Sequence, residues 1–261
     1  MGTEEDPAVE RAVEHLIERD DPQLIVASGD LTHRARPEQQ ARAAAFLRRL
    51  GPPVLAVPGN HDIPWAFPAR FTRPFREFEA RWGTTEPVHS ADDLFVAGVN
   101  SVRPWRHQSG GVRAHQLRRA KELLRGAPQN ALRVVVLHHH LIGAPWRSRK
   151  KPVARRSHVL AALVDAGAEL ILAGHIHQAA VAERHEFEVA PGSLRGAVVS
   201  VAPGLGQPRP DRRGEARGLH VYEAHERELR VETYIWRDQD WGLTATRRFP
   251  RGDEPLAVEP A

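Results

Sequence analysis

The stretch that decides the fold is Leu170-Ile171-Leu172-Ala173-Gly174-His175-Ile176-His177, in which an apolar run gives way to two histidines. Four consecutive apolar residues bounded by turn-forming residues predict a short, buried β-strand. In α/β sheets, ligand-binding groups gather at the carboxyl ends of strands, which is where these histidines lie. The stretch therefore predicts a sheet strand that ends in a candidate site.

Three other apolar runs of the chain end in polar residues of similar kinds. They precede Gly29-Asp30, Gly59-Asn60-His61-Asp62 and the triple histidine His138-His139-His140. Because the carboxyl ends of parallel strands lie at one edge of a sheet, the polar residues of all four stretches are expected to meet there. Each stretch alone has an ordinary explanation as a turn, but the four together predict a metal site.

Helices alternate with these strands in the first two thirds of the chain. The expected helices cover residues 7–19, 37–50, 74–81, 114–125 and 157–166, with Ser157 as a candidate cap, and the expected strands cover 24–27, 54–57, 94–99, 132–137 and 170–173. Later strands, expected at 181–189, 197–201, 219–222, 229–236 and 243–249, have no helices between them. This order predicts an α/β fold with a second, mostly antiparallel sheet packed on the first. We expect one domain over residues 1–251 and a loose tail over 252–261.

The composition narrows the class of protein and the kind of metal site. A chain of 261 residues with 41% hydrophobic residues is long enough to bury a core. The absence of cysteine excludes disulfides and thiolate ligands, so any metal is bound through oxygen and nitrogen. No apolar run approaches the roughly 18 residues of a membrane helix. The acidic start is not a signal peptide, so a cytoplasmic location is expected.

The chain is basic, with a formal net charge of +4 and a pI of about 10.0. One basic cluster stands out, formed by Arg147, Arg149, Lys150, Lys151, Arg155 and Arg156. This cluster is either a solvated loop or a surface that faces a phosphate-bearing substrate. Aromatic residues do not interleave with it, so a nucleic-acid partner is not expected.

A carboxylate, an amide and several imidazoles form a ligand set for divalent metals such as manganese, iron or zinc. The candidate ligands are Asp30, Asn60, His138, His175 and His177. In an extended segment, residues i and i+2 face the same side, so His175 and His177 are expected to point into one site, each toward a different ion. Two ions about 3.5–4 Å apart polarise a phosphoryl group and bind an activated hydroxide, which predicts phosphoester hydrolysis.

Two further residues are candidates for the chemical step. His61 lies beside the candidate ligand Asn60 and can reach the substrate instead of a metal. Asp62 follows it and can orient or tune that imidazole. Within the triple histidine, we expect His140 to be packed or solvated, whereas a role for His139 stays open.

In their order and context, the four stretches resemble the calcineurin-like metallophosphoesterases, and in particular the small bacterial members similar to class III cyclic-nucleotide phosphodiesterases. The family pattern runs Asp-x-His, Gly-Asp, Gly-Asn-His-Asp/Glu, His and Gly-His-x-His, and residues 29–177 carry every element after the first. The resemblance implies a four-layer α/β/β/α sandwich of two mixed sheets. It also implies a dinuclear metal centre and a small phosphoester substrate, such as a cyclic nucleotide or another phosphodiester.

The resemblance also implies a role for each site residue. Asp30 would bridge the two ions, and Asn60, His138 and His175 would complete the shell of one of them. His177 would belong to the other ion. The same resemblance implies that His61 protonates the leaving oxygen.

One departure from the pattern is the missing Asp-x-His, which in the family ends a strand before the first helix. Here the first predicted helix starts at about residue 7, so we expect the first strand to be missing and the true start to lie upstream of Met1. As written, the first ion would keep only Asp30, His177 and water. Two hypotheses follow: a phosphodiesterase that uses a metal-activated hydroxide, and a catalytically impaired metal-binding homologue.

Overall fold

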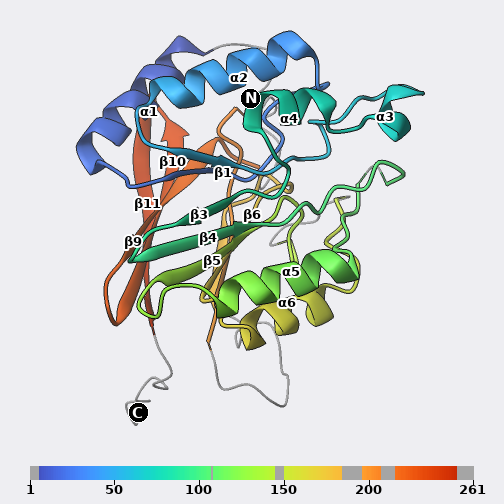
Figure 1. Cartoon of the computed structure of the whole chain (residues 1–261). Helices are drawn as coiled ribbons and strands as arrows, with labels where there is room; N and C mark the ends of the chain where they lie inside the picture. Colours follow the sequence, from blue (N-terminus) through green and yellow to red (C-terminus); the bar gives the residue numbers. More distant parts are fainter. Residues whose placement is uncertain (1–5, 107, 145–149, 184–195, 207–214, 252–261) are drawn as a thin grey trace.

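The computed structural model describes residues 6–106, 108–144, 150–183, 196–206 and 215–251 (Figure 1). The helices there are α1 (Pro7–Asp20), α2 (Pro37–Arg49), α3 (Ala69–Thr72), α4 (Arg76–Trp82), α5 (Ala114–Arg125) and α6 (Arg156–Asp165). The strands are β1 (Ile25–Ala27), β2 (Val54–Ala56), β3 (Val88–Ser90), β4 (Leu94–Gly98), β5 (Leu132–Val136), β6 (Leu170–Ala173), β7 (Ala180–Glu183), β8 (Val198–Val201), β9 (Gly218–Ala224), β10 (Glu228–Arg237) and β11 (Asp240–Pro250). This order confirms the predicted change from alternating helices and strands to strands alone.

The strands form three sheets within the described residues. A six-stranded sheet has the order β3-β4-β5-β6-β8-β7, and its four central strands run parallel. β1 and β2 form a parallel pair, and β9, β10 and β11 form an antiparallel sheet. The mixture of parallel and antiparallel pairing with flanking helices confirms the predicted α/β class.

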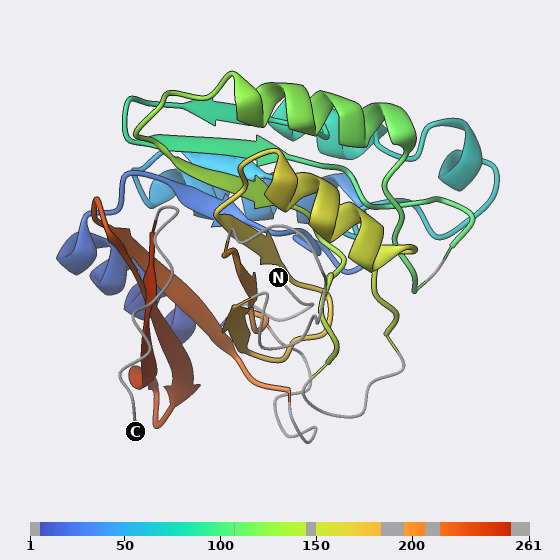
Figure 2. The same ribbon diagram turned by 90° about the horizontal axis from the view of Figure 1, so that it is seen from below.

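The helices and sheets form four layers, as the resemblance implied, with apolar side chains packed between them. Successive residues of a strand point to opposite faces of the sheet. Val135 and Ile171 of the six-stranded sheet therefore pack toward α5 and α6 (Figure 2). Val134 and Leu172 pack on the other face, against residues of the antiparallel sheet. α1 and α2 cover the outer side of β1, β2 and the antiparallel sheet (Figure 1).

Local sequence explains why α1 forms where it does. Its N-cap Asp6 accepts a hydrogen bond from the Ala8 amide at 3.2 Å, and Pro7 occupies the first turn, where its missing N–H costs nothing. Val9, Val13 and Leu16 make the buried stripe of this helix. Among the described residues, no helix is both long and apolar enough to cross a membrane.

Several local predictions differ from the structure. α6 begins at Arg156 with Arg155 as its N-cap, so the prediction that Ser157 caps this helix is wrong. β3 and the single turn α3 were not predicted, because their segment is irregular and rich in proline and arginine. The predicted strand at 181–189 is described only as far as residue 183, and the tail over 252–261 lies outside the described residues.

The layer between the six-stranded sheet and α1 is divided by a cavity of about 1580 Å³. Within the described residues, β1 pairs only with β2, and β9 pairs only with β10. One edge of each of these two strands is therefore not paired with another strand there. The cavity lies between them and is lined by residues of both strands, of α1 and of the six-stranded sheet. The resemblance implied one mixed sheet in this layer lacking its first strand, and the structure has two separate pieces of sheet there.

Candidate metal centre

The ends of β1 and β2 approach each other closely enough to require glycine at both. A Cβ at Gly29, where φ is +92°, would lie 2.7 Å from the Gly59 amide nitrogen and from Nδ1 of His138. A Cβ at Gly59 would lie 2.2 Å from the amide nitrogen and from Oδ1 of Asp30. Because real Cβ atoms do not approach this closely, the two glycines allow Asp30 and the residues after Gly59 to share one site.

Three candidate ligand atoms surround the Nε2 atom of His138. Nε2 lies 3.1 Å from Oδ1 of Asn60, 3.2 Å from Nδ1 of His175 and 3.3 Å from Oδ1 of Asp30. The other ring nitrogen, Nδ1, donates a hydrogen bond to the carbonyl of Ser28 at 2.8 Å. Since a carbonyl only accepts, this bond places a proton on Nδ1 and leaves Nε2 to face the cluster, which is the usual arrangement of a metal-binding histidine.

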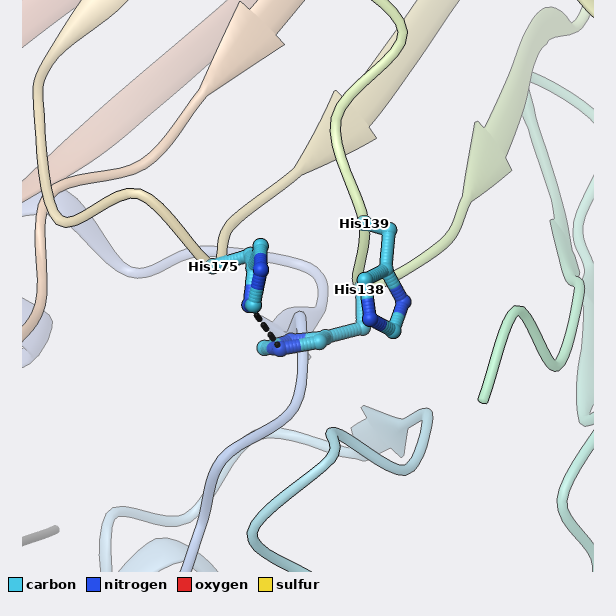
Figure 3. A group of neighbouring side chains, drawn as sticks. All are labelled: His138, His139 and His175. Atoms are coloured by element: carbon cyan, nitrogen blue, oxygen red, sulfur yellow. Dashed lines mark hydrogen bonds between the residues drawn. The ribbon is translucent and has the colours of Figure 1, made fainter. Parts of the chain in front are cut away.

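His175 is oriented in the complementary way. Its Nε2 donates to the carbonyl of Gln108 at 3.1 Å, so its Nδ1 faces His138. Figure 3 shows this contact between the two rings, with His139 next to them. Each of the two histidines therefore has one nitrogen held by a backbone carbonyl and one directed at the same point. Buried oxygen and nitrogen donors of this kind fit a divalent ion of intermediate hardness.

The charges at this cluster are arranged as an ion pair. Burial would raise the pKa of Asp30, but the charge of His138 and its hydrogen bond, with smaller effects of His61 and His175, hold it well below its usual range. Burial acts to lower the pKa of His138, but Asp30 outweighs it, and the pKa is raised. The Asp30 carboxylate is thus ionised and balanced by a proton on His138, which a bound cation would replace.

The ring of His177 lies beside this cluster and contacts a lysine and a glutamate. Its Nε2 lies 3.0 Å from Nζ of Lys150, and its Nδ1 lies 3.7 Å from Oε2 of Glu215. His175 and His177 both have positive φ values, +72° and +57°, so the segment is not extended. The strand-like alternation on which the prediction rested is therefore absent, but both residues line the same cavity, and the assignment of each ring to a different ion stays a prediction.

A hydrogen bond from its backbone amide to Asp30 places His61 at the edge of the site. The His61 amide donates to Oδ1 of Asp30 at 2.9 Å, and the ring Nδ1 donates to the carbonyl of His33 at 2.9 Å. The His33 ring stacks on the His61 ring at 5.5 Å. With its proton on Nδ1 held by a carbonyl, the imidazole has Nε2 as the atom for exchange with a substrate.

Asp62 has a different set of partners from the one expected. Its carboxylate accepts hydrogen bonds from the amides of Gly59 at 2.9 Å, Leu31 at 3.1 Å and Thr32 at 2.9 Å. The ring of His61 is instead oriented by the His33 carbonyl. Burial, together with the charge of Asp30, raises the pKa of Asp62. Asp62 therefore ties the loop after β1 to the loop after β2 and positions Asp30 rather than His61.

The other two histidines of the triplet are buried. His139 joins His138 and His175 in a group whose candidate ligand atoms all lie within 4.8 Å of one another. Its Nδ1 lies 2.9 Å from Oγ of Ser101, and burial together with the charge of His138 holds its pKa well below the usual range. His140 is also buried, so it packs as predicted, and burial lowers its pKa to about 4.

The sequence indicated Lys150 only as one member of the basic cluster. The structure places this residue at the candidate site. Its Nζ contacts Nε2 of His177 at 3.0 Å and donates to the carbonyl of His175. Lys151 and Arg156 are exposed, and residues 145–149 lie outside the described part of the chain. Lys151 and Arg156 thus fit the interpretation of a solvated surface, and the interpretation that the cluster faces a phosphate-bearing substrate stays a prediction, for which Lys150 is the candidate.

Comparison with known proteins agrees with this geometry. A model of the calcineurin-like phosphoesterases matches residues 2–179, which include all the candidate site residues. The chain belongs to the calcineurin-like phosphoesterase family. A dimetal phosphatase from Danio rerio has a similar fold, with a TM-score of 0.63 at 14% identity, covering 93% of this chain and 88% of that one.

Two curated proteins are similar to this calcineurin-like phosphoesterase in sequence. The 3',5'-cyclic adenosine monophosphate phosphodiesterase CpdA of Haemophilus influenzae is 29% identical over 175 residues, covering 64% of this chain and 58% of that protein. A probable cyclic nucleotide phosphodiesterase of Synechococcus is 28% identical over 166 residues, covering 62% of this chain and 61% of that protein. The chain thus matches about three fifths of the length of each relative.

Proposed function

We propose that this chain is a metal-dependent phosphodiesterase that hydrolyses a small phosphodiester, with a cyclic nucleotide as the first candidate substrate. The observation that carries the proposal is the convergence of Asp30, Asn60 and His175 on Nε2 of His138, within 3.3 Å. The cyclic-nucleotide phosphodiesterases among its relatives support the substrate class.

The chain's own residues have separate tasks in this reaction. Asp30, Asn60, His138 and His175 would hold one divalent ion, and Asp30 with His177 would contribute to a second, weaker position. Bound ions supply the positive charge that polarises the phosphoryl group and activates water. His61 would donate a proton from Nε2 to the leaving oxygen, because its Nδ1 is held by the His33 carbonyl. Asp62 holds the loop that carries Asp30.

One observation favours the second hypothesis, a metal-binding homologue with impaired catalysis. The Nε2 atom of His177 lies against the Lys150 ammonium at 3.0 Å, so a cationic side chain stands at the histidine assigned to the second ion. A chain that holds one ion and loses the other would bind metal but turn over slowly.

Metal-dependent hydrolysis of bis(p-nitrophenyl) phosphate and of 3',5'-cyclic AMP separates the two hypotheses. The metal-free protein is titrated in turn with manganese, iron and zinc, and the metal content is measured beside the rate. Turnover that depends on the ion and is lost in Asp30→Asn supports the phosphodiesterase. Binding of metal without turnover of either substrate, or of a panel of phosphomonoesters, would contradict it and favour the second hypothesis.

The identity of the ion, the cytoplasmic location and the single domain over residues 1–251 are also proposals. Nitrogen and oxygen ligands suit manganese, iron and zinc alike, so metal analysis of the protein isolated from its source decides among them. Fractionation of the source cells tests the location, and limited proteolysis tests the domain.

A further inference from the structure

One basic residue, Lys150, lies at the start of a segment that backbone hydrogen bonds attach to the site. The amide of Lys151 donates to the Gln108 carbonyl at 3.2 Å, and Ser109 and Lys151 form a β-bridge. The amide of Val153 donates to the His140 carbonyl at 3.0 Å. These bonds attach the segment after residue 149 to two neighbouring loops.

The Gln108 carbonyl connects this segment directly to the cluster. It accepts a hydrogen bond from Nε2 of His175 at 3.1 Å as well as the one from the Lys151 amide. Successive side chains of an extended segment point to opposite sides. Lys150 accordingly points inward and is partly buried, whereas Lys151 is exposed.

Lys150 lies in the cavity where an anionic substrate would bind beside the candidate metal ligands. Lys150, His61 and His138 line the same cavity. The ammonium lies 3.0 Å from Nε2 of His177, which can accept a hydrogen bond from it. An ammonium at this place can donate a charge-assisted hydrogen bond to a phosphoryl oxygen, and hydrogen bonds of this kind are strong.

We propose that Lys150 is a substrate-binding residue, whose ammonium, seated against His177, contacts a non-bridging oxygen of the phosphodiester. This proposal rests on the proposed function and deepens it by assigning the phosphate-binding cation. The proposal assigns substrate binding to the partly buried Lys150 and not to its exposed neighbour Lys151. A different role is conceivable for the same contact: Lys150 would only fill the place of a second ion.

The two roles are separated by measuring phosphate binding and metal content, without any assay of turnover. Inorganic phosphate is titrated into the manganese-loaded protein by calorimetry, and manganese per chain is measured by mass spectrometry. Lys150→Met removes the charge and keeps the length of the side chain, and Lys150→Arg retains the charge. Lys151→Met is the matched control on the exposed neighbour.

If Lys150 binds phosphate, Lys150→Met weakens phosphate binding at least 10-fold, an effect of the size expected of a charge-assisted hydrogen bond. Lys150→Arg stays within about 3-fold of the unmodified protein, Lys151→Met binds phosphate unchanged, and manganese per chain is the same in all four. Unchanged phosphate binding in Lys150→Met overturns the proposal, as does a gain of manganese with phosphate binding retained. An unmodified protein that does not bind phosphate also overturns it.

The experiment distinguishes a failure of this inference from a failure of the proposed function. Phosphate binding that depends on Lys150 in a protein without phosphodiesterase turnover would leave this inference standing and remove the proposed function. Turnover of cyclic AMP that is unaffected in Lys150→Met, with unchanged phosphate affinity, would do the reverse. Where turnover occurs, the substitution should raise KM more than it lowers kcat, because the contact already exists in the bound substrate.

Discussion

The carboxylate of Asp30 and the imidazole of His138 lie 3.3 Å apart, Oδ1 to Nε2, and form a buried ion pair at the centre of the site. One residue follows β1 and the other follows β5, so the pair joins the two β-layers of the molecule. The same two atoms are the candidate ligands of a metal ion. Protons and metal ions therefore compete for one position, and pH controls both stability and metal binding.

The ion pair of Asp30 and His138 should contribute most to the stability of the metal-free protein between about pH 4 and pH 6.5. The pKa of Asp30 is lowered from 3.8, so its contribution to stability is present above that value and is lost as pH falls through the folded-state pKa. The pKa of His138 is raised from 6.5, so its contribution is complete below that value and is lost as pH rises through the folded-state pKa. Thermal unfolding of the EDTA-treated protein and of Asp30→Asn across pH 3–9 measures this contribution as the difference between the two.

Asp30→Asn is the test of that assignment, because it removes the partner charge and keeps the shape. The variant should lose the fall in stability above pH 6.5. Manganese should bind the unmodified protein less tightly as pH falls below the raised pKa of His138, since the proton must leave first. A stability profile that is identical in the variant and the unmodified protein would contradict the ion pair.

His61→Ala should retain metal and lose turnover. The ring contacts the His33 carbonyl through Nδ1, and the backbone amide, which the substitution keeps, binds Asp30. Loss of a general acid lowers kcat by about 10²–10⁴-fold. His33→Ala is the control, because the carbonyl that orients His61 belongs to the backbone and survives the change. Equal turnover in His61→Ala and the unmodified protein would remove the proposed acid.

Asp62→Ala should lower the free energy of unfolding by about 2–4 kcal/mol. The same substitution should also weaken metal binding. The carboxylate is 1% exposed and accepts bonds from the amides of Gly59, Leu31 and Thr32, which the substitution leaves buried without an acceptor. Denaturant unfolding measures the loss. The exposed Asp92→Ala is the control and should stay within about 0.5 kcal/mol. A stable Asp62→Ala variant with normal metal affinity would show that the loop holds Asp30 by other means.

The cavity between β1 and β9 should accept a β-strand that leads into α1. The Ile25 amide donates to Pro53 of the β2 side and the Ala27 carbonyl accepts from Val57, so the peptide groups of Val26 between them face the cavity. Buried backbone groups need hydrogen-bond partners, which a strand supplies and an apolar molecule does not. α1 begins at the site end of the cavity, where Asp6 pairs with Arg217 at 2.5 Å. A strand before α1 would thus run parallel to β1.

A chain extended before Met1 by an apolar segment of about five residues tests this expectation. With a strand in place, the Val26 amide and those of the β9 edge should exchange hydrogen at least 100-fold more slowly, and the melting temperature should rise. An extension of the same composition in scrambled order is the control. Unchanged exchange at Val26 in the extended chain would contradict the expectation.

The sequence by itself determined the order of helices and strands and the kinds of ligand that follow each strand. These features are local, because the period of apolar residues and the Gly-Asp, Gly-Asn-His-Asp and Gly-His-Ile-His stretches are read within a few residues. It also predicted that Asp30, Asn60, His138 and His175 would meet, since parallel strands share one edge. Short elements such as α3 and β3 could not be predicted in this way, because three or four residues are too few to show a period of apolar residues.

Only the tertiary structure decided how the side chains of the site are oriented. The left-handed backbone at His175 and His177 turns the second ring toward Lys150, and the carbonyls of Ser28, Gln108 and His33 select which imidazole nitrogen is exposed to a ligand. The cavity beside β1 likewise depends on strands that lie almost 200 residues apart in the chain. Orientation and cavities come from contacts between distant segments, and no local pattern in a sequence records them.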